Sequence, residues 1–164
     1  MDQRLNKILL HPLYQDYYRK IEEHEHDRLF CKHNMTHFLD VARISYIIAL
    51  ETDPVAAMSL RERIYAAALL HDIGRHEEYS LGIPHERASA SLCLPILIDA
   101  GFLEDEIHEI QKAIVNHRNP NYRDENNLSG YIYRGDKASR PCHSCRHEHL
   151  CNWDQSKKNL SLKY

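Results

Sequence analysis

Apolar side chains in this chain recur every three or four residues between short breaks that contain glycine or proline. This helical period is the feature that most limits the fold, and no segment shows the apolar–polar alternation of a half-buried strand. It predicts helices over residues 13–29, 35–51, 59–70, 84–100, 103–117 and 128–140. Pro95 is expected to kink or break the fourth helix, and Gly74, Gly82 and Pro84 are expected to frame a loop. We therefore predict an all-α helical bundle.

Length and charge narrow the class of protein. A chain of 164 residues can bury a core without disulfides, and we divide it into a helical domain over 1–140 and a cysteine-rich tail over 141–164 packed on that domain. The net charge of −3 argues against a broad face for duplex nucleic acid and leaves room for a local basic pocket. No apolar run has the length of a signal peptide or a membrane span. We predict a cytoplasmic protein and leave its oligomeric state open.

Thirteen histidines are present, and two of them begin a His-Asp pair. His26-Asp27 lies in the charged run 22–28 and is typical of a solvated helix face. His71-Asp72 follows the apolar run 66–70, at the end of a helix that should be buried. Because buried polar groups need partners, the second pair indicates a site.

Three more metal-competent residues share this pattern: His37, His117 and Asp136 each fall on the apolar stripe of a separate predicted helix. Any one of them alone is more often a hydrogen-bonded core residue than a metal ligand. Together they favour a metal site, because a helix bundle can direct side chains from several helices at one centre.

The segments around these residues resemble the HD-domain superfamily of metal-dependent phosphohydrolases. His37-Phe-Leu-Asp-Val-Ala is similar to the superfamily's first helix, the run from Ala67 through His71-Asp72 to Arg75 to its signature, and Asp136-Lys137 to its last element. The resemblance covers about 100 residues and implies a helical core in which His37, His71, Asp72 and Asp136 bind one divalent metal ion.

A second ion is also implied by the resemblance. His85 and His117 stand where binuclear members carry the ligands of a second metal, and Asp72 would then bridge the two ions. Cyclic-dinucleotide phosphodiesterases of that branch have paired histidines where this chain has His117-Arg118, so that match is incomplete. Mononuclear nucleotidases often carry a glutamate at the position of Arg75, which disfavours the simple nucleotidase reading.

The chemistry suits this ligand set. A metal ion activates water for attack on a phosphate ester or anhydride, and mixed histidine and carboxylate ligands suit Fe, Mn, Zn, Ni or Co, as one or two ions. Arg75 and Lys137 are candidates to hold the substrate phosphate, with ordinary surface charge as the alternative. We expect a hydrolase of a small phosphorylated substrate, with a nucleotide favoured. The alternatives are a nucleotide- or metal/redox-sensing protein without activity and a di-iron oxidative enzyme.

The tail carries Cys142, Cys145 and Cys151 at spacings that can chelate a metal ion or cluster. The segment resembles the iron–sulfur loop of endonuclease III-type glycosylases, but the fourth cysteine of that loop is missing. We predict a zinc ion or an iron–sulfur cluster with Cys31 as the fourth ligand. A local histidine (His143, His147 or His149) is the alternative ligand, unliganded thiols are the alternative state, and Cys93 is typical of a core thiol.

Overall fold

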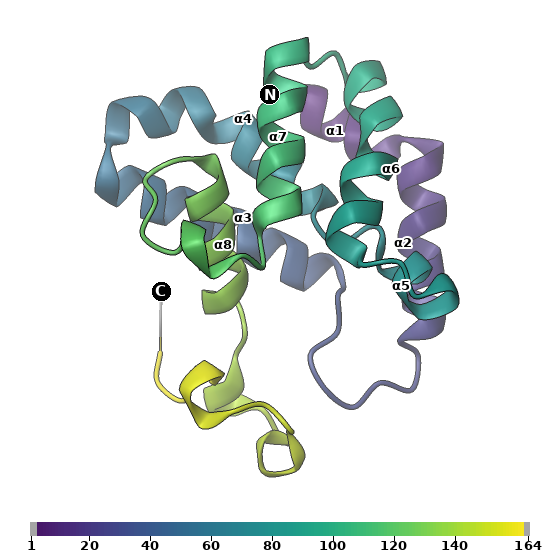
Figure 1. Cartoon of the computed structure of the whole chain (residues 1–164), viewed down its shortest axis with the longest axis vertical. Coiled ribbons are helices and arrows are strands. Elements are labelled where there is room, and N and C mark those ends of the chain that lie inside the picture. The colour runs from purple at the N-terminus through teal and green to yellow at the C-terminus, as the bar shows by residue number, and fades with distance from the viewer. Residues whose placement is uncertain (1–2, 163–164) are drawn as a thin grey trace.

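The computed structural model describes residues 3–162 (Figure 1). This part of the chain contains no strand, which confirms the all-α prediction. The α-helices are α1 (Gln3–Leu10), α2 (Pro12–His24), α3 (Met35–Thr52), α4 (Pro54–Leu70), α5 (Arg75–Leu81), α6 (His85–Ala100), α7 (Glu104–Asn116) and α8 (Leu128–Ala138). Four short 3-10 helices follow or interrupt them: η1 (Pro120–Tyr122), η2 (Cys142–Ser144), η3 (Glu148–Leu150) and η4 (Gln155–Lys157).

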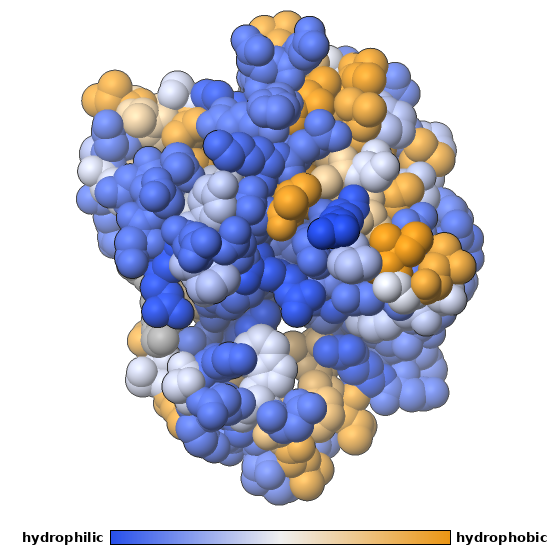
Figure 2. Space-filling model, in the orientation of Figure 1, coloured by the Kyte–Doolittle hydropathy of each residue, from blue (hydrophilic) through white to orange (hydrophobic). Residues whose placement is uncertain are grey.

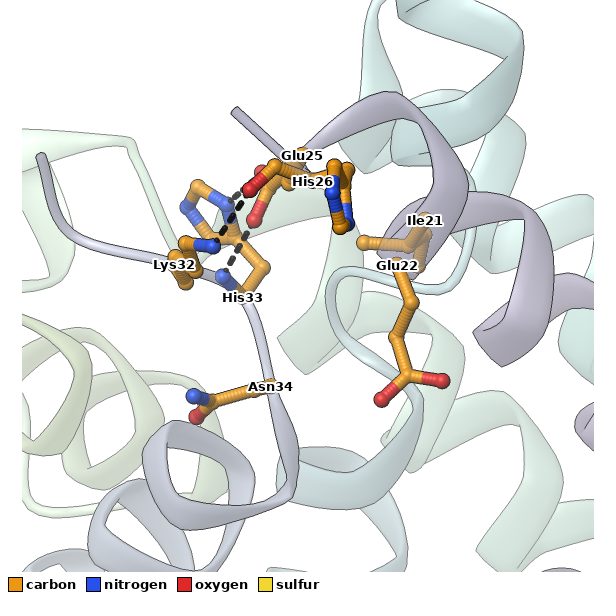
Figure 3. Close-up of a pocket in the computed structure, with 7 residues that line it drawn as sticks. All are labelled: Ile21, Glu22, Glu25, His26, Lys32, His33 and Asn34. Atoms are coloured by element: carbon orange, nitrogen blue, oxygen red, sulfur yellow. Dashed lines mark hydrogen bonds and ion pairs between the residues drawn. The ribbon is translucent and has the colours of Figure 1, made fainter. Parts of the chain in front are cut away.

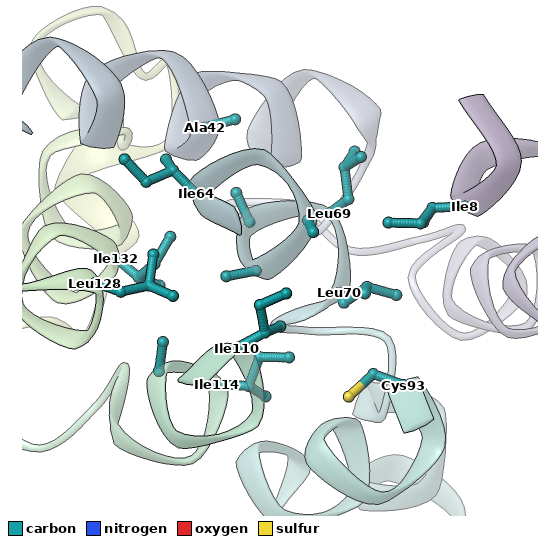
Figure 4. Packing of buried hydrophobic residues seen from close by; sticks show 14 of the residues in the cluster. Ile8, Ala42, Ile64, Leu69, Leu70, Cys93, Ile110, Ile114, Leu128 and Ile132 are labelled. Atoms are coloured by element: carbon teal, nitrogen blue, oxygen red, sulfur yellow. The ribbon is translucent and has the colours of Figure 1, made fainter. Parts of the chain in front are cut away.

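Helix α4 lies at the centre of the bundle and contacts α1, α3, α6, α7 and α8 (Figure 4). Its last turns, residues 66–70, are buried on all sides. The run of three alanines lets the neighbouring helices approach closely, while Leu69 and Leu70 fill the space between them. The end of α4, and the His71-Asp72 pair that follows it, is therefore held inside the core.

Several helices differ from the predictions, among them α4, which begins at Pro54 rather than at residue 59. Helix α1 was not predicted, and the segment expected to be a loop holds helix α5, which ends at Gly82 in the left-handed conformation (φ 71°). Helix α2 ends at His24, so the pair His26-Asp27 lies in an exposed turn rather than on a helix face. Helices α1 and α5 span only eight and seven residues, which is too short for a clear helical period.

Helix α6 runs through Pro95 without a break, so the expectation of a break at this proline was wrong. Proline in a helix removes one N–H donor and frees the carbonyl four residues earlier. Both Pro95 and that residue, Ser91, lie on the exposed face of α6. Water can reach the freed carbonyl there, so the helix continues.

The tail extends from the end of α8 as a series of 3-10 turns below the helical body (Figures 1 and 2). Asn159 fastens it to α8, since its amide donates to the carbonyls of Lys137 (2.7 Å), Ala138 (3.2 Å) and Arg140 (3.0 Å). The division into 1–140 and 141–164 stays a prediction. Within the described residues, no helix combines the length and the apolar character needed to cross a membrane.

Candidate metal centre

The His71-Asp72 pair occupies the turn between α4 and α5. Both side chains are buried, with residue exposures of 0% and 1%. Gly74 closes the turn against α6, where its N–H donates to the Ser89 hydroxyl (2.9 Å). A Cβ on Gly74 would lie 2.6 Å from the Cβ of Ala88. The glycine therefore lets the turn pack directly on α6, which fixes the position of Asp72.

The two carboxylate oxygens of Asp72 face different histidines. Oδ2 lies 3.2 Å from Nε2 of His71 and 3.6 Å from Nε2 of His37. Oδ1 lies 3.2 Å from Nε2 of His85 and 3.7 Å from Nε2 of His117. The ligand atoms thus form two groups, one of His37, His71 and Asp72 and one of Asp72, His85 and His117, each with all atoms within 4.8 Å of one another. Asp72 belongs to both groups.

Asp136 reaches the first group from α8. Its Oδ1 lies 3.7 Å from Nε2 of His37. Gly135 lets α8 come close to α3, because a Cβ there would collide with the Ser45 side chain. One turn further, the Ser139 hydroxyl lies 3.3 Å from Nδ1 of His37. The close packing of α3 and α8 therefore brings together two of the predicted ligands.

The histidines present the same ring nitrogen to the centre because the other one is held by an acceptor. The Nδ1 contacts are His71 with the Ala68 carbonyl (2.7 Å), His117 with the Ile114 carbonyl (2.6 Å) and His85 with the Glu78 carboxylate (2.7 Å). A carbonyl or carboxylate oxygen can only accept, so each Nδ1 carries the proton. Each Nε2 is then left with a lone pair, which is the arrangement of metal-ligating histidines.

The pKa values of the buried groups at the centre are shifted from their usual range. Burial by itself raises the pKa of Asp72, but Arg75 and His71 outweigh it and hold that pKa well below its usual range. Burial also lowers the pKa of His117 to about 3. The pKa of His71 is raised, because Asp72 outweighs the opposing effect of burial. A proton therefore competes with a metal ion for His71.

Several buried polar atoms of the site have no hydrogen-bond partner and are suitable metal ligands. Nε2 of His37, Nε2 of His71 and Oδ1 of Asp72 are buried without a hydrogen-bond partner. Buried polar atoms are almost always partnered, and imidazole and carboxylate groups are good ligands for divalent transition metals. The residues present therefore suit one ion in each group.

The two residues predicted to hold phosphate lie at the edge of the centre. Arg75 begins α5 with its Nε 3.3 Å from Asp72 Oδ1 and its Nη1 3.4 Å from Glu78. Lys137 lies 2.5 Å from Asp136 Oδ2, with about a third of its side chain exposed. Both cations already face a carboxylate, so a phosphate group would join existing ion pairs.

One residue at the centre was missed by the sequence analysis. His33 is buried, and its Nε2 lies 3.7 Å from Asp72 Oδ2. Its Nδ1 lies 2.5 Å from Glu25, which also accepts from the His33 backbone N–H (2.7 Å) (Figure 3). The same carboxylate accepts from the Tyr79 hydroxyl (2.5 Å). Burial lowers the pKa of His33 to about 4. A neutral imidazole with a free Nε2 thus faces the centre beside His37.

The tail cysteines gather at a second place. Cys31, Cys142, Cys145 and Cys151 all line one pocket between the connection from α2 to α3 and the tail. Cys93 is buried in α6, where its thiol donates to the Ala90 carbonyl (3.3 Å), as expected of a core thiol. The ligand roles of the four pocket cysteines stay a prediction.

Comparison with known proteins places this geometry in a family. Residues 34–141 match the HD domain, a span that runs from the residue that caps α3 to the start of the tail. A protein of Clostridium beijerinckii described as uncharacterized is 41% identical over 161 residues, which cover 98% of this chain and 99% of that protein. No solved structure matches. The chain belongs to the HD-domain family, whose members form a superfamily of metal-dependent phosphohydrolases.

Proposed function

We propose that this chain hydrolyses a phosphate ester or anhydride of a nucleotide or related small molecule at a centre of two divalent metal ions. The observation that carries the proposal is the Asp72 carboxylate, whose two oxygens face two separate groups of histidines. A carboxylate placed in this way can bridge two ions. His37, His71 and Asp136 would complete the first site, and His85 and His117 the second.

The metal would supply the chemistry that the side chains lack, since bound divalent ions lower the pKa of water and neutralise charge on phosphoryl oxygens. The protein side chains would hold the metal ligands in place and bind the substrate phosphate. Arg75 lies within 3.3 Å of Asp72 and holds its carboxylate in place. The more exposed Lys137 is the better placed cation to meet a phosphate that arrives from solvent.

The ligand set restricts the metal but does not select one. Four imidazole and two carboxylate groups of mixed hardness suit Fe, Mn, Zn, Ni or Co. Because metal ligands must be deprotonated, the raised pKa of His71 predicts weaker metal binding as the pH falls. Anaerobic purification followed by metal analysis would identify the ions and their number.

The test uses the second His-Asp pair of the chain as its control. Asp72→Asn and Asp27→Asn make the same chemical change, one at a buried site and one at an almost fully exposed turn. Protein loaded in turn with each metal is assayed for phosphate release from nucleotides and simple phosphate esters. Asp72→Asn should lose both metal and activity, and Asp27→Asn should keep both.

Two outcomes would replace the proposal. If metal binds but no substrate of the panel releases phosphate, and a nucleotide still binds, the chain is a sensor rather than a hydrolase. If turnover requires iron and consumes oxygen, it is an oxidative enzyme. Equal metal content in Asp72→Asn and Asp27→Asn would contradict the site itself.

A further inference from the structure

The pocket beside the tail brings together cysteines that are more than a hundred residues apart in the sequence. Cys31 comes from the connection between α2 and α3, whereas Cys142, Cys145 and Cys151 come from the tail. The pocket measures about 330 Å³. On the face shown in Figure 2, a hollow separates the tail from the helical body. Four of the five cysteines of the chain thus share one cavity.

Both segments are shaped to present these residues. Each of two tail cysteines ends a 3-10 turn, with Cys145 N–H donating to the Cys142 carbonyl (3.2 Å) and Cys151 N–H to the Glu148 carbonyl (3.0 Å). On the other side, Arg28 Nε donates to the Cys31 carbonyl (2.9 Å). Tight turns of this kind allow closely spaced cysteines to chelate one centre.

The tail has no apolar core to keep it in place. The buried apolar cluster of the described chain contains no residue from 141–162, and the buried residues of this segment are Lys158 and Asn159. Short segments that cannot bury enough apolar surface usually need a disulfide or a metal as a staple. The cysteines here form no disulfide, and a shared metal centre is a cross-link that four thiols in one pocket can form.

The spacing of the thiols argues for a centre larger than one zinc ion. Tetrahedral zinc with bonds of about 2.3 Å brings its sulfur ligands to roughly 3.8 Å from one another. In the described chain, the groups of three or more metal-competent side chains within 4.8 Å contain no cysteine. An iron–sulfur cluster spaces its cysteines more widely, because iron and inorganic sulfide fill the space between them.

The charges around the pocket suit a negatively charged cluster. Lys32, Arg140 and Lys158 line it, against the two acids Asp40 and Glu148. Arg140 is held in position by the Trp153 ring, 3.9 Å from the guanidinium carbon. From these observations we propose that Cys31, Cys142, Cys145 and Cys151 bind an iron–sulfur cluster, which staples the tail to the connection between α2 and α3.

The cluster would share a wall with the HD centre. His37 and Ser139 also line the pocket, and Arg140 lies 3.7 Å from Asp136 Oδ1. A centre that fixes residues 139–142 would therefore hold Ser139 against His37 and Arg140 against Asp136. The proposal does not rest on the hydrolase function, since it concerns different side chains and a different cofactor. On binding, each thiol loses its proton to solvent. Sulfide and iron enter from outside, two ferrous and two ferric ions for a four-iron cluster or two ferric ions for a two-iron cluster, so no electron is gained or lost.

The experiment is anaerobic reconstitution of the full chain with sulfide and a mixture of ferrous and ferric iron. Acid-labile sulfide is the main readout, because the histidine and carboxylate ligands of the HD centre give no reason to retain it. We expect iron and sulfide in equal amounts at the cysteines, about two or four of each per chain, with visible absorption that bleaches in air. The Asp72→Asn background should keep the sulfide while it loses the HD metals.

The matched variants are single Cys→Ser changes. Cys31→Ser, Cys142→Ser, Cys145→Ser and Cys151→Ser should each lose most of the sulfide and absorption. Cys93→Ser is the control, since serine can also donate to the Ala90 carbonyl. One zinc ion per chain without sulfide would overturn the cluster. Full sulfide retention in Cys31→Ser would overturn the proposed fourth ligand, and a metal-free tail would overturn the site.

Discussion

Replacement of Glu25 by glutamine tests whether the connection between α2 and α3 is held by a buried charge. Glu25 is 3% exposed and accepts hydrogen bonds from the backbone N–H and the ring of His33 and from Tyr79. Burial by itself raises the pKa of Glu25, but the hydrogen bonds from His33 and Tyr79 outweigh it and lower that pKa to about 2. The folded chain therefore stabilises the ionised carboxylate.

The size of the effect follows from that shift. A pKa that falls from 4.5 to about 2 on folding corresponds to about 3 kcal/mol of stability at neutral pH. Because the folded-state pKa is the lower one, this stability is present above pH 4.5 and is lost as the pH falls towards 2. Near pH 3.5 about 2 kcal/mol should remain.

Urea unfolding of the metal-free chain measures this difference. Glu25→Gln should lower the free energy of unfolding by about 3 kcal/mol at pH 7, and its deficit against the wild type should shrink as the pH falls to 3.5. The control is Glu51→Gln, at an exposed position of α3, with an expected change within about 0.5 kcal/mol. Equal effects of the two changes, or a deficit that does not depend on pH, would refute the reasoning.

Three further predictions concern the metal centre. The double change His85→Ala with His117→Ala should reduce the HD centre from two ions to one in a metal analysis, and two retained ions would contradict the bridged site. Gly74→Ala should lower the free energy of unfolding by about 1–3 kcal/mol, because its Cβ would collide with Ala88 of α6; an unchanged urea midpoint would show that the turn can move. Metal at about a hundredfold excess over Kd should stabilise the chain by about 2.7 kcal/mol for each bound ion, a rise in Tm of roughly 5–10 °C per ion, and this rise should be absent in Asp72→Asn.

The fold class could be predicted because apolar residues recur at helical spacing in this chain and no segment alternates like a strand. A clear apolar face is present on α2, α7 and α8. The predicted starts of the helices at 35 and 128 coincide with those of α3 and α8. Asn34 and Asn127 cap these helices with side chains that accept from His37 N–H and Gly130 N–H. Helices α1 and α5 were missed because two turns are too few to show a period.

The candidate ligands could be recognised because each lies in a local pattern on a helix or directly after one. His33 could not be recognised in this way, because the residues that surround it are distant from it in the sequence. Its partner Glu25 belongs to the charged run 22–28, which is typical of a solvated face. The burial of both residues depends on how the connection between α2 and α3 folds over the centre. The available signal was weak: His33 stands four residues before His37, but on a loop rather than a helix.

The position of His33 also explains why metal binding and the stability of this fold should be linked. The imidazoles of His71, His85 and His117 each donate through Nδ1 and so direct an Nε2 lone pair at Asp72, as His33 does through Glu25. Several lone pairs around one buried carboxylate are unfavourable unless a cation lies between them. Arg75 supplies one positive charge from the side of Oδ1. Two divalent ions would satisfy all of these acceptors at once, so the residues proposed to bind metal are also the residues whose burial would cost most without it.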